Sequence, residues 1–315
     1  MGDNLMKWPC HSLRLSVLMA VLWFALSAAQ THAIIVDGTA DAAYGPALAV
    51  QNTQTGFGKN TLGDVAIANG SELDQAFATI QGGTLYLTLA GNLETNFNKL
   101  DIFFDTGITG QNELRGDNSN IDFNLLNRMG DDGSGNGLRF DTGFNAAYWI
   151  SVTVGGLPTT LYANYAVLLP TGGGPGYYVG RGTPGGGGTL SAGINPNGIR
   201  VDLNNSSTAG VTAGTGLDSG AGVTTGVELA IPLLALGNPS GPIKISAFIN
   251  TFQHDFVSNQ LLGGIGGGDN LGEARNVDFS AIAGDQFFIV IPEPATSTLV
   301  GLGVLGILVA RRPKA

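Results

Sequence analysis

The sequence predicts an all-β fold, a β-sandwich or jelly roll, with an N-terminal signal helix and a C-terminal transmembrane helix. Three observations lead to this prediction. The 315 residues include 50 glycines, about twice the usual share, and glycine is costly inside helices but useful in turns. Many short apolar runs alternate with period two between Gly-rich turns, as strands do. Both ends of the chain combine an uncharged apolar stretch with basic residues.

Residues 1–33 are expected to be a signal peptide for export. A short basic region precedes an apolar run over residues 15–29, and small residues occupy the positions before the expected cleavage site. Cleavage is expected after Ala33, with Ala28 or Ala29 as alternatives. An uncleaved anchor is the other interpretation, but the apolar run is short for a membrane span of ~20 residues.

Loss of the signal would leave a chain without cysteine and with His254 as its single histidine. Disulfides, thiolate nucleophiles, Cys-based zinc sites and a His-rich metal cluster are thereby excluded. The whole chain has a net charge of −10, and residues 34–291, with nine basic and 22 acidic residues, carry −13. Such an acidic domain favours solubility and argues against nucleic acid, whose binding depends on neutralising phosphates.

The last 25 residues, 291–315, are built from three parts. In order, these are the motif Pro292, Glu293 and Pro294, the uncharged stretch 295–310, and the basic residues Arg311, Arg312 and Lys314. A helix over the uncharged stretch would be ~24 Å long, slightly short of a ~30 Å hydrocarbon core. The basic residues are expected to act as a cytoplasmic membrane stop, which leaves the preceding domain outside.

This order of motif, short apolar helix and basic cluster resembles the PEP-CTERM sorting signal of Gram-negative bacteria. The same tail is also labelled an ice-binding protein C-terminal domain, a name that does not imply ice binding. The resemblance implies an exosortase-type processing enzyme as partner, which recognises the motif and processes the chain near it. The protein would first lie in the inner membrane with its domain facing the periplasm, and then reach the cell envelope or extracellular matrix. The alternative is a plain single-span anchor.

Between these ends, residues 34–290 are expected to form one β-sandwich domain with Gly-rich loops. Strands are predicted where apolar residues alternate with period two, because alternate side chains then share one face. The predicted strands are 85–89, 100–104, 150–154, 227–231, 243–249 and 287–290.

Several segments of the domain are less regular. Residues 72–80 fit a helix or a strand, and we favour the strand because a turn signal follows. One helical turn is expected at 233–236. Residues 171–198 include 12 glycines in 28 residues, and 262–272 is mostly glycine. Both segments are expected to be surface loops, the first with a short strand at 177–179.

Three separate parts of the domain together carry a second resemblance. They are the opening Ile34-Ile35-Val36-Asp37-Gly38-Thr39 with Asp41, the strands 85–90 and 99–106, and the late segment with Glu228, Ile231 and Pro232. Together they resemble family-nine-type carbohydrate-binding modules and DOMON-like sandwiches. Tyr44 stands where that pattern has a tryptophan, so no sugar-binding residue of the family is assigned here. The resemblance implies a sandwich with a capacity for polysaccharide.

Aromatic residues gather in the middle of the chain, and Tyr148, Tyr162 and Tyr177 are candidate glycan-binding residues. Exposed aromatic rings can stack on the apolar C–H faces of sugars. The alternative is that about half of these rings fill the core, since strand residues alternate between faces.

A candidate calcium site lies at Asp132, Ser134 and Asn136, where oxygen-bearing side chains alternate as in the first half of an EF-hand loop. Position twelve of that pattern is Gly143 rather than glutamate, so the bidentate ligand is missing, although Asp131 or Asp141 could substitute. A polar hairpin loop is the alternative.

No motif for catalysis stands out. The chain has no Gly-x-Ser-x-Gly elbow beside its one histidine and no Gly-Lys-Ser/Thr phosphate loop. The expected function is therefore a structural or adhesive role without catalysis at the cell envelope or in the extracellular matrix. A polysaccharide-binding module of the cell surface is the alternative. A glycoside-active enzyme is the second alternative, since an acidic stretch at 94–122 offers carboxylates.

Overall fold

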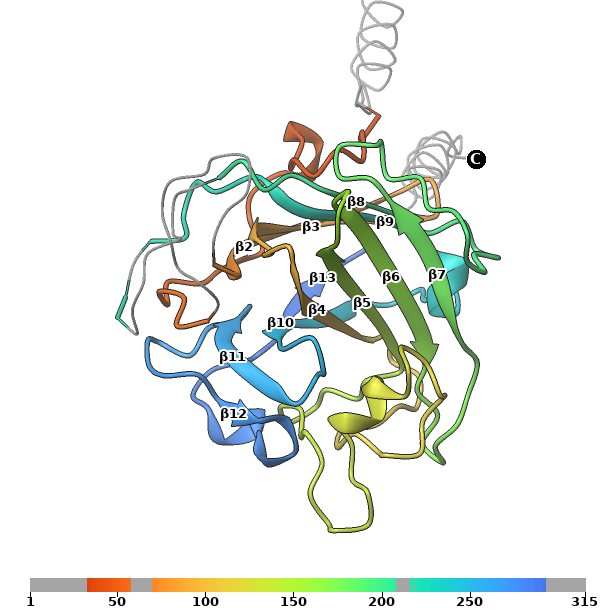
Figure 1. Cartoon of the computed structure of the whole chain (residues 1–315), viewed down its shortest axis with the longest axis vertical. Helices are drawn as coiled ribbons and strands as arrows, with labels where there is room; N and C mark the ends of the chain where they lie inside the picture. The colour runs from red at the N-terminus through yellow and green to blue at the C-terminus, as the bar shows by residue number, and fades with distance from the viewer. Residues whose placement is uncertain (1–32, 58–69, 208–215, 218, 293–315) are drawn as a thin grey trace, which may run out of the picture. The chain divides into compact units, whose positions relative to one another are not determined.

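The structure, a computed structural model, describes residues 33–57, 70–207, 216–217 and 219–292 (Figure 1). The expected signal helix, transmembrane helix and basic membrane stop lie outside these residues, as do Glu293 and Pro294. Among the described residues, no helix has the length and apolar character needed to cross a membrane.

The described residues form thirteen strands and five short 3-10 helices, which confirms an all-β fold. The strands are β1 (Ala49–Val50), β2 (Glu72–Gln81), β3 (Thr84–Asn92), β4 (Asn96–Asp105), β5 (Tyr148–Gly155), β6 (Thr160–Val167), β7 (Gly176–Gly182), β8 (Arg200–Leu203), β9 (Gly226–Pro232), β10 (Ile243–Asn250), β11 (Phe256–Leu261), β12 (Gly272–Glu273) and β13 (Phe288–Val290). The 3-10 helices are η1 (Ala42–Tyr44), η2 (Leu125–Arg128), η3 (Leu233–Leu236), η4 (Ala274–Asn276) and η5 (Phe279–Ala281).

The strands build two antiparallel sheets, as a sandwich requires. One sheet has the order β1-β2-β3-β9-β8, and the other has the order β12-β11-β10-β4-β5-β6-β7, with β13 paired to β10 (Figure 1). The six strands predicted from alternation correspond to β3, β4, β5, β9, β10 and β13, and residues 72–80 fall in β2. The helical turn at 233–236 is η3. The strand at 177–179 is confirmed and is longer, because β7 runs through much of the segment expected to be a loop.

The first core lies between the two sheets. Leu85, Leu87 and Leu89 of β3 face inward and meet the inward residues of β4, including Leu100 and Ile102. All five side chains are buried, and burial of each such side chain is worth about 1.5–3 kcal/mol. The period-two pattern in the sequence therefore creates the apolar faces by which the two sheets pack together.

A second core covers part of the outer face of the eight-stranded sheet. Phe103, Trp149 and Phe248 point away from the first core and pack against loop residues such as Phe140 and Phe279. This cover reaches β10 and β11 but leaves the outer face of β4 to β7 accessible at one end, where the candidate site lies.

The opening segment of the domain is fixed to β9 by a buried carboxylate. The Tyr44 hydroxyl donates to Glu228 Oε1 at 2.6 Å, and the backbone N–H groups of Asp37 and Gly38 donate to Glu228 Oε2 at 2.8 and 2.9 Å. Burial raises the pKa of Glu228, which these hydrogen bonds partly offset. The segments that carry the resemblance to carbohydrate-binding sandwiches are therefore in direct contact.

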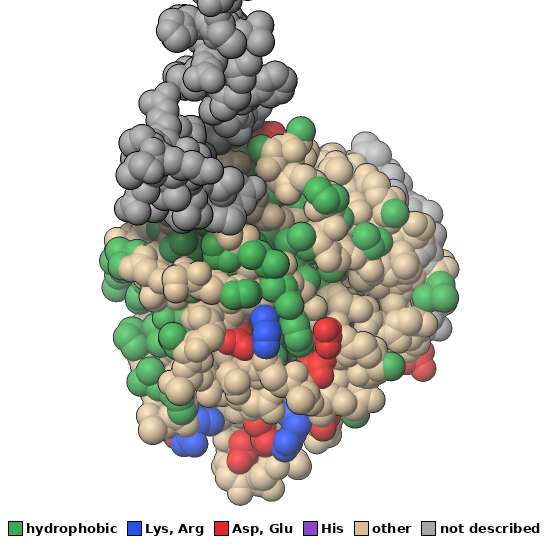
Figure 2. Space-filling view, turned by 180° about the vertical axis from the view of Figure 1, so that it is seen from behind, with side chains coloured by type: hydrophobic (Ala, Val, Ile, Leu, Met, Phe, Trp, Pro, Cys, Tyr) green, Lys and Arg blue, Asp and Glu red, His purple; other side chains and the backbone are tan. Residues whose placement is uncertain are grey.

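The surface carries little charge. Figure 2 shows one face of the molecule, on which hydrophobic and uncharged polar groups dominate and the few basic side chains lie among acidic ones.

Candidate functional site

The open part of the outer face holds a cavity of about 630 Å³. Its lining comprises Phe97, Lys99, Asn120, Ile121, Asp122, Phe123, Thr153, Tyr162, Asn164 and Tyr178. Strand register brings the sheet residues together. Thr153 of β5 pairs with Lys99 of β4 on one side and with Tyr162 of β6 on the other, and Asn164 of β6 pairs with Tyr178 of β7. Residues from four adjacent strands thus form one floor, about 14 Å across at ~4.8 Å per strand.

Four aromatic rings surround this floor. Tyr162 and Tyr178 are half-buried, Phe97 is 41% exposed and Phe123 is 94% exposed. The rings of Phe97 and Tyr162 lie 6.2 Å apart at an angle of 41°, so they do not stack fully on each other. Large aromatic side chains that a fold leaves exposed around one hollow offer apolar contact to a ligand.

The backbone at the rim is strained. Phe97 and Phe123 have φ of 70° and 57°, and Asp122 and Asn124 on either side of Phe123 have 51° and 69°. Bulky residues rarely adopt this left-handed region, and each such residue costs about 1–3 kcal/mol. Strain of this kind is concentrated at ligand-binding sites. The two most exposed rings of the cavity are therefore both held in an unfavourable backbone conformation by the surrounding structure.

A chain of buried charges holds the rim in place. Lys99 Nζ donates to Asp122 Oδ2 at 2.6 Å, and the same oxygen lies 2.9 Å from His254 Nε2. His254 Nδ1 lies 2.9 Å from Asp101 Oδ2, and Trp149 Nε1 donates to Asp101 Oδ1 at 2.9 Å. All of these side chains are buried. We refer to Lys99, Asp122, His254 and Asp101 as the charge chain.

The geometry makes His254 a cation, because both ring nitrogens face carboxylate oxygens and each must carry a proton to donate. Burial alone would lower the pKa of His254, but the charge of Asp101 and hydrogen bonds to Asp101 and Asp122 raise it. Burial would likewise raise the pKa of Asp122, but His254 and Lys99 lower it to about 2. The charge chain therefore pairs two cations with two anions and ties residue 122, and with it Phe123, to the sheet.

The three predicted glycan-binding tyrosines do not share one surface. Tyr162 lines the cavity, whereas Tyr148 is buried in the first core and Tyr177 packs against that core from its edge. The rings of Tyr148 and Tyr177 lie on either side of Tyr165, at 6.3 and 4.9 Å. The three-residue site is therefore revised: Tyr178, next to Tyr177 in the chain, is the one that faces the cavity with Tyr162.

The predicted calcium ligands Asp132, Ser134 and Asn136 lie in a surface loop. Asp132 Oδ2 accepts from Arg275 Nη1 at 2.7 Å, and its Oδ1 accepts from the backbone N–H of Ser134 at 3.3 Å. Among the described residues, no group of three or more His, Cys, Asp or Glu side chains could hold a metal ion. Calcium binding by this loop stays a prediction.

Sequence reasoning missed most of the cavity. Asn164 and Tyr178 could have been found from Tyr162, because they follow from period-two spacing and strand pairing once the register is known. His254 is a buried residue whose two ring nitrogens each face a carboxylate. Phe97 and Phe123 carry no signal in the sequence, because Phe97 lies at a register shift near the start of β4 and a loop presents Phe123.

Replacement of His254 by alanine should destabilise the fold by about 3–5 kcal/mol, since it leaves Asp101 buried without a cation and Asp122 with Lys99 alone. Urea unfolding of the His254→Ala variant tests this. Arg115→Ala, which removes an exposed cation paired with Asp117, is the control and should change the free energy of unfolding little. Equal stability of His254→Ala and the unchanged protein would contradict the assignment of His254 as the cation that pairs with Asp101 and Asp122.

The stability of the unchanged protein should also depend on pH. The raised pKa of His254 stabilises the fold fully below ~6.5, and this contribution is lost as pH rises through the folded-state value. The lowered pKa of Asp122 stabilises the fold fully above its ordinary value of 3.8, and this is lost as pH falls toward 2. Unfolding free energies measured from pH 2 to 9 should therefore be highest between about 4 and 6.5, and the His254→Ala variant should lack the decline above that window.

Comparison with known proteins identifies the C-terminal end. The PEP-CTERM protein-sorting motif matches residues 290–312, which confirms the sorting tail predicted from the sequence. No curated protein and no solved structure matches the chain, so its likeness to carbohydrate-binding sandwiches stays a prediction. The match begins at Val290, the last residue of β13. The chain is an exported protein that carries a PEP-CTERM sorting motif and is processed by an exosortase.

Proposed function

We propose that this exported protein has a structural or adhesive role, without catalysis, at the cell envelope or in the extracellular matrix, and that it holds polysaccharide in the cavity over β4 to β7. The observation that carries the proposal is the set of exposed aromatic rings, held in strained backbone, around a polar floor. Phe123 is 94% exposed, and the ring of Phe97 lies against Gly155 while 41% of the residue stays exposed.

The chemistry of the cavity suits a sugar. A sugar ring has an apolar C–H face, which an aromatic ring can cover, and a rim of hydroxyls that need both donors and acceptors. Amide side chains supply both kinds of group, and Asn120 and Asn164 bring two of them into the cavity. Neither amide hydrogen-bonds to another side chain or to backbone within the described part of the chain, although Asn164 is buried.

The electrostatics of the cavity favour binding over hydrolysis. Asp122 is the one carboxylate among the ten lining residues, and its pKa is lowered to about 2 by His254 and Lys99. A glycosidase needs a second carboxyl group, and its general acid has a raised pKa. An ionised, ion-paired aspartate supports a positioning role for Asp122 rather than proton transfer.

The place of the sorting motif supports release of an intact domain. β13 is hydrogen-bonded to β10, and the exposed Ile291 follows it directly. Processing at Pro292, Glu293 or Pro294 would therefore leave all described strands in the released protein. Release would carry the aromatic cavity to the cell envelope or the matrix, where polysaccharide is the abundant polymer.

Phe123→Ala should weaken polysaccharide binding about tenfold, or ~1.4 kcal/mol, and leave stability nearly unchanged because the ring is 94% exposed. Affinity electrophoresis in gels that contain neutral or acidic polysaccharides measures this. Tyr86→Ala is the matched control, since Tyr86 is a half-buried aromatic residue on β3 of the other sheet. If the unchanged protein binds none of the polymers, or if both variants bind like it, the proposed binding function is wrong.

Replacement of Pro292, Glu293 and Pro294 by alanine should block release. The unchanged protein is expected in the extracellular fraction with an intact mass that begins near Ile34 and ends within the motif. The variant should stay in the membrane fraction and retain Arg311, Arg312 and Lys314. Release of the variant at the unchanged rate would show that the motif does not direct processing, and a membrane-bound wild type with all three basic residues would indicate a plain anchor.

A further inference from the structure

The cavity continues beyond the four aromatic rings. Tyr162 also lines a neighbouring hollow of about 490 Å³, and that hollow shares Pro158 and Thr183 with a third one of about 580 Å³. Each hollow thus has a wall in common with the next. The three hollows therefore follow one another from the floor over β4 to β7, past the end of β7, to residues 203–206 next to β8.

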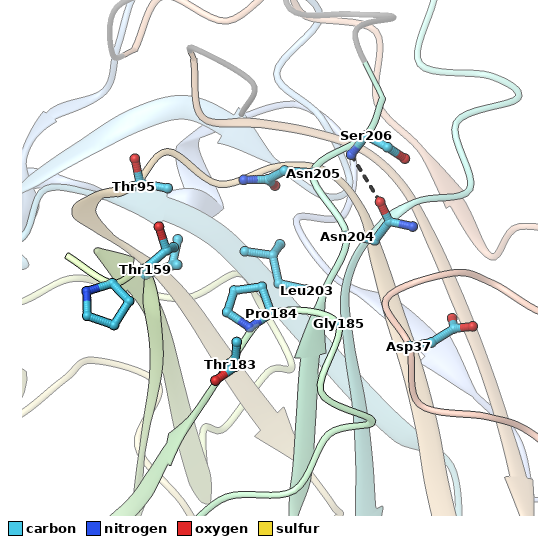
Figure 3. Close-up of a pocket in the computed structure, with 12 residues that line it drawn as sticks. Asp37, Thr95, Thr159, Thr183, Pro184, Gly185, Leu203, Asn204, Asn205 and Ser206 are labelled. Carbon is cyan, nitrogen blue, oxygen red and sulfur yellow. Dashed lines mark hydrogen bonds between the residues drawn. The ribbon is translucent and has the colours of Figure 1, made fainter. Parts of the chain in front are cut away.

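The third hollow is lined by small polar groups, by apolar side chains such as Val154 and Leu203, and by the carboxylate of Asp37, with no aromatic ring. Figure 3 shows Thr95, Thr159 and Thr183 around an opening, with Leu203 and Pro184 between them. None of the three hydroxyls hydrogen-bonds to another described residue, so each is available to a ligand. Hydroxyls of this kind suit the continuation of a polymer whose first units occupy the aromatic end.

A β-bulge places a cation in the middle of the groove. Residues 178 and 181 are three apart and would lie on opposite faces of a regular strand. In β7 the register shifts, so that Tyr178 pairs with Asn164 and Arg181 pairs with Tyr162. Gly180 allows the shift, because its φ of 145° and the Ser191 carbonyl next to it leave no room for a side chain. Both Tyr178 and Arg181 therefore face the groove. Bulges near binding sites often redirect a side chain in this way.

Arg181 differs from the other described basic residues. Lys99, Arg115, Arg128, Arg139, Lys244 and Arg275 all lie in ion pairs with Asp or Glu. Arg200 has no ion pair but donates to the backbone oxygen of Gly187 at 2.6 Å. Within the described ranges, the exposed guanidinium of Arg181 has neither an ion pair nor a hydrogen bond. In a domain with a net charge of −13, a guanidinium without a partner inside a groove indicates a place for an anionic group of a ligand.

We propose that the three hollows form one groove for an extended acidic polysaccharide, and that a carboxylate of one sugar unit pairs with Arg181. This inference rests on the proposed function, which it deepens by naming the class of polymer. A planar guanidinium can hold a carboxylate through two parallel hydrogen bonds. The net charge of −13 on residues 34–291 repels polyanions, so their binding depends on the pairing with Arg181.

Polygalacturonate and its carboxyl-reduced form are the probes, because the two polymers share a backbone and differ in charge. Binding of both is measured by isothermal titration with the protein recovered from the extracellular fraction. The unchanged protein should bind the acidic polymer about tenfold more tightly, with a preference that shrinks as salt is added. Arg181→Gln should remove this preference and leave the affinity for the reduced polymer unchanged. Arg139→Gln, which removes the same charge from the ion pair with Glu113, is the matched control and should keep the preference.

The outcomes separate this inference from the proposed function. If Arg181→Gln binds both polymers like the unchanged protein while Phe123→Ala loses binding, the role of Arg181 is wrong and the aromatic site stands. If Arg139→Gln loses the preference equally, the effect is one of net charge, and the pairing with Arg181 is overturned. If the unchanged protein binds neither polymer but binds another polysaccharide in affinity electrophoresis, this inference is wrong and the proposed function stands. If it binds no polysaccharide in either experiment, both are wrong.

Discussion

The groove depends on the charge chain beneath it. Four ionised groups are buried under the outer face of β4, at a cost of several kcal/mol per ion unless each is paired. Each is paired: His254 lies between Asp101 and Asp122, and Lys99 completes the chain. These contacts hold Asp122 in one position, and they thereby fix the left-handed backbone conformation of residues 122–124. The exposed ring of Phe123 is therefore positioned by electrostatics, since no apolar packing covers it.

The two faces of the eight-stranded sheet have different roles. Its inner face packs against the other sheet and supplies stability, whereas its outer face is covered by loops at β10 and β11 and open at β4 to β7. The bulge in β7 adds Arg181 to the open part without changing the inner face, where Val179 stays buried. The sorting motif begins where β13 ends, so processing within the motif leaves both faces of the sheet intact.

The sequence predicts the sheets better than the groove. Strands such as β3 and β4 alternate large apolar with polar residues, and their positions were predicted correctly. β6 was missed because alanines dilute its alternation, and β7 was predicted only over residues 177–179 because glycines surround it. The site was predicted only through Tyr162, because Phe97 is positioned by a register shift in β4, Phe123 by a loop conformation and Arg181 by a bulge. None of these leaves a periodic trace, and the partners of His254 are over 100 residues away in the chain.

The central claim is that this exported protein holds polysaccharide in the groove over β4 to β7. Amide hydrogen exchange of the released protein, with and without polygalacturonate fragments, tests it most directly because exchange reports on each loop separately. The account predicts slower exchange in residues 120–124, 156–159 and 183–188, which border the groove, and no change in the loop at 132–136. Protection confined to other surfaces, or absent at saturating fragment, would contradict the claim.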